Sequence, residues 1–326
     1  MVPSAPTVIC AGLSTLDVVH LVDAVPSANQ KAVARESFIA AGGPATNAAV
    51  AAARCGSATA LITAAPEGPL TDMVRTDLAA HHVDLRVEDE SRALPVAAIM
   101  VTRATGERAV VSPTASAVDV PVTPPAFDPE SHLHGARAVL IDGYHRHLSL
   151  PLAWAARDAG IPVILDAGSY KAHTPELLDS VDIAVVSHDF TFPGSSGDDP
   201  DTIERLLDAG ASAAVVTRGG GPMLAAVKDA GDGGTALTEV PVAAVEVVDT
   251  LGAGDFLHGA LAHRIALLGW EPARLVVDLA WASRVVGVSL RSFGTRAWLE
   301  EALPPDVPEG LDAPAAPNAP KAPPAR

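Results

Sequence analysis

Residues 249–260 read Asp-Thr-Leu-Gly-Ala-Gly-Asp-Phe-Leu-His-Gly-Ala and carry the strongest signal in the chain. A β-branched run, 245–248, is predicted to form a strand that leads into this glycine turn, and an apolar helical pattern, 256–268, leaves it. Such a strand, turn and helix start bind anions, because the backbone N–H groups point outward and the helix dipole adds partial positive charge. The segment therefore predicts a site for a phosphate or a similar anion.

The carboxylate in this stretch, Asp255, sits where the predicted helix begins. A carboxylate there is usually an N-cap, but beside a bound phosphoryl group it can accept the proton of an attacking hydroxyl. The N–H groups of Ala253, Gly254 and Asp255, in the turn that starts at Gly252, would then form an anion hole. The segment favours phosphoryl transfer. Because the chain has no Gly-x-x-x-x-Gly-Lys-Ser/Thr loop, the P-loop class is excluded.

The same residues resemble the C-terminal signature of the PfkB-type, or ribokinase-like, carbohydrate kinases, whose core is Asp-Thr-x-Gly-Ala-Gly-Asp. A second stretch, Gly42-Gly43-Pro44-Ala45-Thr46-Asn47, is similar to the family's Gly-Gly-x-x-x-Asn-x-Ala segment. The resemblance covers about 7–300 and looks nearest to the ketohexokinase and sulfofructose kinase branch. It implies an ATP-dependent kinase of a sugar hydroxyl, with a ribokinase-like three-layer α/β/α domain, a mostly parallel central sheet and a small β-sheet lid.

The rhythm of predicted elements agrees with an α/β fold. From 136 onward strands and helices alternate, which indicates βαβ units and a parallel sheet. Near the N-terminus the pattern predicts a strand over 32–39, a turn over 40–44 and a helix over 45–55. Two strand-rich stretches, 13–39 and 95–112, interrupt this rhythm. They form either an edge extension of the main sheet or a separate lid, and the resemblance favours the lid. We expect an α/β kinase domain at 1–12, 40–94 and 113–303, a lid at 13–39 and 95–112, and a disordered Pro- and Ala-rich tail at 304–326.

Polar residues in the first fifth of the chain are the candidates for sugar binding. Asp17 is a charged residue in an apolar strand, so it should face solvent or a polar ligand. Asn47 offers a donor and an acceptor, which suits polyols, and Gly43 lets the backbone approach a ligand closely. The resemblance implies a sugar-binding role for all three. Asn29 and Lys31 lie near substrate-binding positions of fructose and sulfofructose kinases, and an ordinary solvated loop is the equal alternative.

The resemblance also implies nucleotide-binding positions in the second half of the chain. Residues 217–221, Thr-Arg-Gly-Gly-Gly, look like the family's Thr-x-Gly-x-x-Gly turn shortened by one residue. A hydroxyl and exposed amides can hold phosphate oxygens there. A late helical stretch stands where the family lines its adenine pocket, although Trp281 is equally consistent with core packing. The candidates are Thr217, Gly219, Gly221, Thr250, Trp281 and Ala282.

Mg²⁺ is expected as a cofactor together with ATP, because ATP carries it and the phosphates need charge neutralisation. The family's Asn-x-x-Glu motif corresponds to 187–190, Ser-His-Asp-Phe, which keeps neither residue. Asp249 and Asp189 remain as candidate metal contacts through water. A monovalent cation such as K⁺ is a further option that the resemblance leaves open.

Composition limits the partners. The formal net charge is −17, from 22 basic and 39 acidic residues, which argues against nucleic acid as a partner. ATP must then meet a local positive field, although Arg103 and Arg108, beside a predicted hairpin turn, are expected to be surface residues.

The two cysteines make a disulfide framework improbable and favour a reducing cytoplasm. No apolar run reaches the roughly 18 residues of a membrane span. A homodimer through the lid is left open.

The identity of the sugar is the least determined point. Sulfofructose kinases bind the substrate anion with the lysine that Lys31 matches and with a further Asn and Arg. The positions here that are nearest to that Asn and Arg are Ser112 and Tyr144. We therefore expect a neutral ketohexose or pentose rather than an anionic sugar. A nucleoside kinase is weaker, because Phe38 is the only aromatic residue in the two lid stretches. A non-catalytic sugar-binding regulator on the same fold is also weaker, because Asp255 is present.

Overall fold

The computed structural model describes residues 7–113, 127–228, 236–242 and 244–306. Most of the predicted tail, 307–326, lies outside these residues. The first residues of that predicted tail are docked on the domain: the backbone oxygens of Pro305 and Asp306 accept hydrogen bonds from Trp281 and Arg264. The prediction of a disordered tail is therefore wrong for 304–306, because two side chains of the domain bind its backbone.

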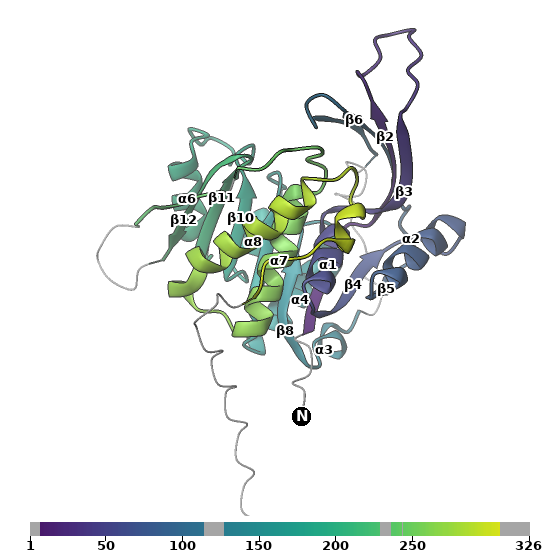
Figure 1. The fold of residues 1–326 in the computed structure, drawn as a ribbon. Coiled ribbons are helices and arrows are strands. Elements are labelled where there is room, and N and C mark those ends of the chain that lie inside the picture. Colours follow the sequence, from purple (N-terminus) through teal and green to yellow (C-terminus); the bar gives the residue numbers. More distant parts are fainter. Residues whose placement is uncertain (1–6, 114–126, 229–235, 243, 307–326) are drawn as a thin grey trace, which may run out of the picture.

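A nine-stranded sheet forms the centre of the molecule (Figure 1). Its strand order is β13-β12-β11-β10-β9-β8-β1-β4-β5. The strands from β11 to β5 pair in parallel, and β12 and β13 are antiparallel additions at one edge. The bounds are β1 (Thr7–Ala11), β4 (Ala58–Ala64), β5 (Val83–Asp89), β8 (Ala136–Ile141), β9 (Val163–Ala167), β10 (Ile183–Ser187), β11 (Ala213–Arg218), β12 (Gly221–Val227) and β13 (Thr238–Val240).

Helices cover both faces of this sheet. In β1, Val8 and Cys10 enter one hydrophobic cluster while Ile9 and Ala11 enter the other, as expected for a strand that is buried on both sides. The first face carries α1 (Pro44–Arg54), α2 (Pro69–Ala80), α7 (Ala253–Leu268) and α8 (Leu275–Ser289). The second carries α3 (Pro129–His132), α4 (Arg146–Asp158), α5 (Thr174–Leu178) and α6 (Asp199–Asp208). The predicted three-layer α/β/α architecture is confirmed.

Two of these helices, α1 and α7, pack unusually closely. A Cβ atom at Gly259 would lie 2.1 Å from the carbonyl oxygen of Ala48, so only glycine permits this approach. Alanine-rich surfaces allow such packing because they have little side chain to separate the backbones. The contact brings the first turn of α1, with Asn47, beside the first turn of α7, with Asp255.

A second, four-stranded sheet has the order β3-β2-β6-β7 and is called the small sheet below. Its strands are β2 (Thr15–Val22), β3 (Glu36–Gly42), β6 (Val96–Thr102) and β7 (Arg108–Val111). Val19, Leu21 and Ile99 point to one face, where Phe38 and Phe293 pack against them. The two strand-rich stretches thus build a separate sheet, and the alternative of an edge extension is wrong.

Two local predictions are also wrong. The strand predicted over 32–39 begins at Glu36 and continues to Gly42, because 40–42 pairs with 15–17 of β2. The predicted turn therefore shrinks to Gly43, and α1 starts at Pro44. The strand predicted over 245–248 does not form. Instead, the N–H of Val248 donates to the backbone oxygen of Leu290 at the end of α8. A β-branched run is only a weak strand signal when no neighbouring strand pairs with it.

One strand of the large sheet was not predicted from the sequence. β5, Val-Asp-Leu-Arg-Val-Glu-Asp, is the edge strand beside β4, and its alternation of apolar and charged residues is typical of a half-exposed strand.

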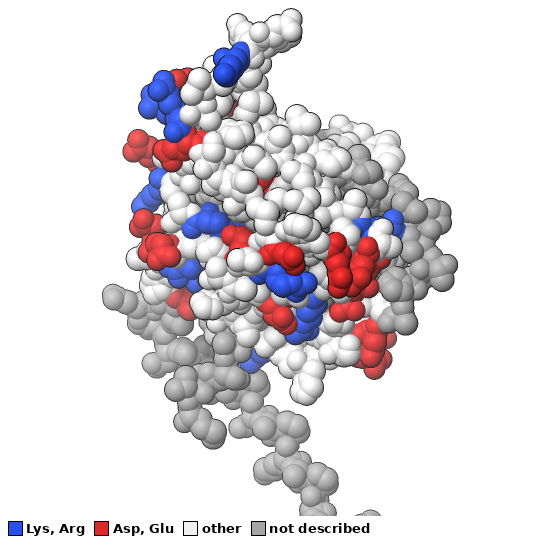
Figure 2. All heavy atoms as spheres, turned by 90° about the vertical axis from the view of Figure 1, so that its right-hand side faces the viewer, with Lys and Arg blue, Asp and Glu red and all other residues white. Residues whose placement is uncertain are grey.

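Figure 2 shows basic and acidic side chains interspersed on the face that carries α2 and the small sheet, without a continuous basic stripe among the described residues. None of the helices in the described ranges is long and apolar enough to cross a bilayer.

Candidate active site

The start of α7 presents unpaired backbone donors. Gly252 adopts a left-handed conformation with φ of 77°, and a Cβ atom there would lie 2.8 Å from the Phe256 ring. In the described part of the chain, no acceptor binds the N–H groups of Gly254 and Asp255. The N–H of Ala253 donates to Thr250 at 3.3 Å, so two of the three predicted anion-hole donors are free and the third is shared.

The Asp255 carboxylate lies beside these donors and accepts a hydrogen bond of 2.8 Å from Asn47 Nδ2. Burial, together with the nearby Asp166 charge, raises the pKa of Asp255 to about 7. The hydrogen bond from Asn47 and the charges of His258 and Arg108 act in the opposite direction on this pKa. A carboxylate that titrates near neutrality suits a general base, because it is ionised at working pH yet basic enough to take a proton.

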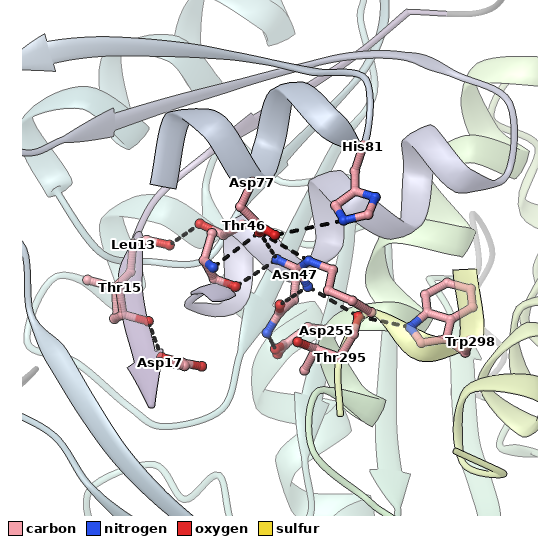
Figure 3. Close-up of polar contacts among 12 residues, drawn as sticks. Leu13, Thr15, Asp17, Thr46, Asn47, Asp77, His81, Asp255, Thr295 and Trp298 are labelled. Atoms are coloured by element: carbon pink, nitrogen blue, oxygen red, sulfur yellow. Dashed lines mark hydrogen bonds and ion pairs between the residues drawn. The ribbon is translucent and has the colours of Figure 1, made fainter. Parts of the chain in front are cut away.

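Asn47 is itself held by a network that the sequence did not reveal (Figure 3). Arg296 donates from Nη1 to Asn47 Oδ1 at 3.4 Å and pairs with Asp77 through Nε and Nη2 at 3.1 and 2.9 Å. It also donates to the backbone oxygen of Ala41, at the end of β3, at 2.7 Å. Because Oδ1 faces a donor, the amide presents Nδ2 to Asp255. The only sequence signal is a lone arginine shortly after an apolar helix.

Asp17 lies in β2 on the inner face of the small sheet, which is the face that carries Val19 and Leu21. Its carboxylate accepts a hydrogen bond of 2.6 Å from Thr15. Burial raises the pKa of Asp17, and the Arg296 charge counteracts this effect. A solvated position, one of the two alternatives for Asp17, does not fit this burial; contact with a polar ligand stays a prediction.

The turn between β6 and β7 closes over the start of α7. Thr250 Oγ1 donates to Gly106 at 3.0 Å, and the Arg108 guanidinium lies 3.4 Å from both oxygens of Thr250. Arg108 is exposed, as expected, but it also supplies a cation near Asp255. Arg103, its neighbour in the hairpin, pairs instead with Asp23 on the surface. Arg108 therefore contributes local positive charge beside Asp255.

Two predicted substrate residues are not part of this cluster. Asn29 and Lys31 are exposed in the long loop between β2 and β3, which projects from the molecule in Figure 1. No described contact joins either residue to Asp17 or Asp255. Gly43, in contrast, lies at the start of α1, where its carbonyl accepts the N–H of Asn47.

The predicted nucleotide turn lies between β11 and β12, at the carboxyl edge of the parallel strands. Thr217 Oγ1 donates to Val186 at 3.3 Å, and Arg218 pairs with Asp199 at 2.5 Å. Gly219 has a positive φ of 58°, and a Cβ atom there or at Gly220 would meet no other atom within 4 Å. Open backbone at this edge is where ligands bind in parallel α/β sheets. The turn thus has room for a ligand, while the Thr217 hydroxyl already has a partner.

Trp281 and Ala282 are buried in the packing of α8. The indole of Trp281 donates to Pro305 at 2.9 Å, and its ring lies 5.3 Å from the Arg264 guanidinium. Ala282 is completely buried. The prediction that they contact adenine finds no support, and core packing, the alternative for Trp281, describes what the structure shows.

The residues proposed to contact Mg²⁺ do not assemble a metal site. Asp249 accepts the N–H groups of Leu251 and Gly294 at 2.8 and 2.9 Å, so both carboxylate oxygens are used by the backbone. Asp189 is exposed after β10. Within the described ranges no three His, Cys, Asp or Glu side chains come together in a way that could hold a metal ion. The water-mediated contacts of Asp249 and Asp189 with Mg²⁺ stay a prediction.

Comparisons with known proteins agree with this fold. Residues 5–300 match the sequence model described as pfkB family carbohydrate kinase. The ribokinase of Giardia lamblia superposes with a TM-score of 0.73 at 18% identity, covering 91% of this chain and 96% of that one. Arabidopsis thaliana ribokinase, complexed with ribose and ATP, gives 0.69 at 19% identity over 91% and 100% of the two chains.

Fructokinase from Xylella fastidiosa, with bound ATP, gives a TM-score of 0.64 at 19% identity over 89% of this chain and 93% of that one. At these identities the structural likeness establishes the fold. The match of the family model over nearly the whole described chain goes further: this protein belongs to the pfkB family of carbohydrate kinases.

Proposed function

We propose that this protein is an ATP-dependent kinase that phosphorylates a hydroxyl group of a neutral ketohexose or pentose. The observation that carries the proposal is the position of Asp255, whose carboxylate lies beside two unpaired N–H groups at the start of α7. A base and an anion-binding helix start side by side suit the transfer of a phosphoryl group to a hydroxyl.

In the proposed reaction the sugar oxygen attacks the γ-phosphorus of ATP and its proton passes to Asp255. The new oxygen–phosphorus bond forms as the bond to the β,γ-bridging oxygen breaks, and ADP leaves with that electron pair. The N–H groups of Gly254 and Asp255 would hold the transferred group, and Arg108 would face its charge. Mg²⁺ on the nucleotide would neutralise further phosphate charge.

The sugar would lie between the small sheet and the start of α1. Asp17, on the inner face of β2, and the backbone at Gly43 would border the sugar. Asn47 would serve two roles, because Nδ2 orients the base while the amide adjoins the sugar. The small sheet would act as the lid, since its β6–β7 turn already contacts Thr250.

The choice of a neutral sugar rests on charge. Lys31, the residue that favours an anionic substrate, is exposed in a loop and touches none of the site residues. The ribose-bound and fructokinase relatives make ribose and fructose the first sugars to test. A member of the ketohexokinase branch would prefer the ketose, whereas a sulfofructose kinase would need Lys31 to reach the site.

A coupled assay of ADP release decides between these substrates. The panel is fructose, ribose, sulfofructose, fructose 6-phosphate and adenosine, each with wild type and Asp255→Asn. We expect the highest kcat/KM with fructose or ribose and no turnover by the variant. A tenfold preference for an anionic sugar would contradict the neutral-sugar proposal. If no compound raised ADP release above the sugar-free rate, the non-catalytic alternative would replace the kinase.

A second copy of this chain is the proposed partner of the outer face of the small sheet. Ile39 and Val111 are 54% and 70% exposed there, and the register aligns them with Val18 and Ala98 in one row across the four strands. An exposed apolar sheet face of this kind favours association. Sedimentation equilibrium should show a dimer that Val111→Glu dissociates; a wild-type monomer at high concentration would contradict the proposal.

A further inference from the structure

An unpaired buried lysine lies at the carboxyl edge of the parallel strands, behind the proposed sugar site. Lys171, in the loop after β9, is only 8% exposed. Its Nζ lies 4.2 Å from the centre of the Tyr144 ring. This Nζ atom forms no ion pair or hydrogen bond with the described residues, whereas the backbone N–H of Lys171 donates to Thr174. Burial lowers the pKa of Lys171, while the charges of Asp142 and Asp166 counteract this.

The nearest candidate partner, Asp142, is already satisfied. One of its oxygens accepts the N–H groups of Leu13 and Ala45 at 2.8 and 3.1 Å, and the other accepts the N–H of Tyr144 at 2.9 Å. Asp142 therefore fastens the end of β8 to the loop after β1 and to the start of α1. Ala45 lies between Gly43 and Asn47. Asp142, next to Lys171, therefore adjoins the segment proposed to bind sugar.

Asp166, in β9, is the second buried group without a proper partner. It is 6% exposed, and its Oδ2 accepts no hydrogen bond from the described residues. His258 Nδ1 approaches it to 3.3 Å but lies closer, at 2.6 Å, to the carbonyl of Gly254. Burial raises the pKa of Asp166 to about 8, and its charge also raises the pKa of Asp255. Asp166 thus lies close enough to the proposed base to act on its pKa.

Unpaired buried polar groups are rare because they destabilise the folded state, and a pair of them beside a reactive group often marks a ligand site. We propose that Lys171 and Asp166 form a subsite for a second hydroxyl of the acceptor sugar, one that is not phosphorylated. The Lys171 ammonium donates to the hydroxyl oxygen, and the hydroxyl proton is donated to Asp166 Oδ2. This inference rests on the proposed sugar kinase activity and names two further specificity residues for it.

The surroundings favour a hydroxyl over an anionic group. Three carboxyl groups, Asp142, Asp166 and Asp255, share this region with one lysine, so a substrate carboxylate or phosphate would meet repulsion. A hydroxyl is the group that can accept from the ammonium and donate to the carboxylate at the same time. The lysine loop is also fixed in place, because His173 Nε2 donates to the Gly143 carbonyl at 2.8 Å.

Lys171→Met is the first test, with Lys228→Met as the matched control, since the Lys228 Nζ donates to the Leu207 carbonyl on another part of the sheet. We expect Lys171→Met to lower kcat/KM for the best sugar by roughly 10- to 100-fold, mainly through KM, without a change in the KM of ATP. The melting temperature should rise or stay equal, because the substitution removes an unpaired buried charge. Lys171→Arg should restore part of the affinity.

Monodeoxy analogues of the same sugar identify the hydroxyl. The analogue that lacks it should be a poor substrate for wild type and should lose nothing further in Lys171→Met or Asp166→Asn. The subsite would be overturned by equal losses on every analogue or by an unchanged sugar KM. It would also be overturned by a lower melting temperature with a proportional loss of kcat/KM for ATP. If wild type phosphorylated no sugar, the proposed function itself would fail; if it did and both variants matched it, only the subsite would fail.

Discussion

The two ends of the proposed site are built in different ways. The phosphoryl end consists mainly of backbone N–H groups and one carboxylate within 249–255, with Arg108 beside them. The sugar end gathers side chains from β2, α1, α2, β9 and the segment after α8, which are far apart in the sequence. A site made by one local turn can be inferred from a motif, whereas a site made by distant side chains depends on how the layers pack.

The largest effect is expected at the phosphoryl end. Asp255→Asn should fold normally and bind ATP but lower kcat by about 10²- to 10⁴-fold, the usual loss when a general base is removed. Turnover of ATP with the best sugar is the measurement, and Asp72→Asn, an exposed carboxylate on α2, is the control. A variant that kept more than about a third of the wild-type kcat would exclude Asp255 from the chemistry.

The next effect tests the link between the two ends. Arg296→Met should leave the Asn47 amide without its Oδ1 donor and remove a cation from the site, so we expect kcat to fall roughly tenfold. The pKa of Asp255 should rise, because the hydrogen bond that favours its charged form becomes weaker. The acid limb of the kcat/KM profile should therefore move to higher pH.

Arg284→Met, on the exposed side of α8, is the control for this change. Arg296→Lys should recover part of the loss if charge is what matters. A fall in kcat without any shift of the acid limb would indicate that Arg296 only stabilises the fold.

At the sugar end, Asp17→Asn should raise the KM for sugar several-fold and leave the KM of ATP unchanged, because a neutral amide accepts a hydroxyl proton less strongly than a carboxylate. Asp23→Asn, in an exposed ion pair with Arg35 beyond the end of β2, serves as control. Equal changes in both KM values would place Asp17 outside the sugar site.

The smallest effect concerns the C-terminal segment. Truncation after Asp306 should be silent, since the residues beyond it are rich in Pro and Ala and lack apolar periodicity. Truncation after Leu303 should lower the melting temperature by a few degrees, because it also removes the acceptors of Trp281 and Arg264. Identical melting curves for the two truncations would show that those hydrogen bonds contribute nothing.

Much of the fold followed from the sequence because its signals are local. The alternation of strands and helices after 136 predicted a parallel sheet, and the glycine turn before α7 carried the family resemblance that implied the α/β/α layers. The register of β3 was missed, because Ala40–Ala41–Gly42 looks like a turn until β2 lies beside it. Arg296 and Lys171 were missed for a related reason: a single basic residue has no pattern, and only tertiary packing brings each of them close to Asp255 or its neighbours.

The central claim is that Asp255 takes the proton of the sugar hydroxyl. The most direct test is the pH dependence of kcat/KM for the best sugar at saturating ATP, with wild type and Asp255→Asn measured together. Since only the ionised carboxylate accepts a proton, wild-type kcat/KM should fall tenfold for each pH unit below a pKa of about 7, and the variant should be low and flat in that range. An acid limb that persists unchanged in Asp255→Asn would contradict the account.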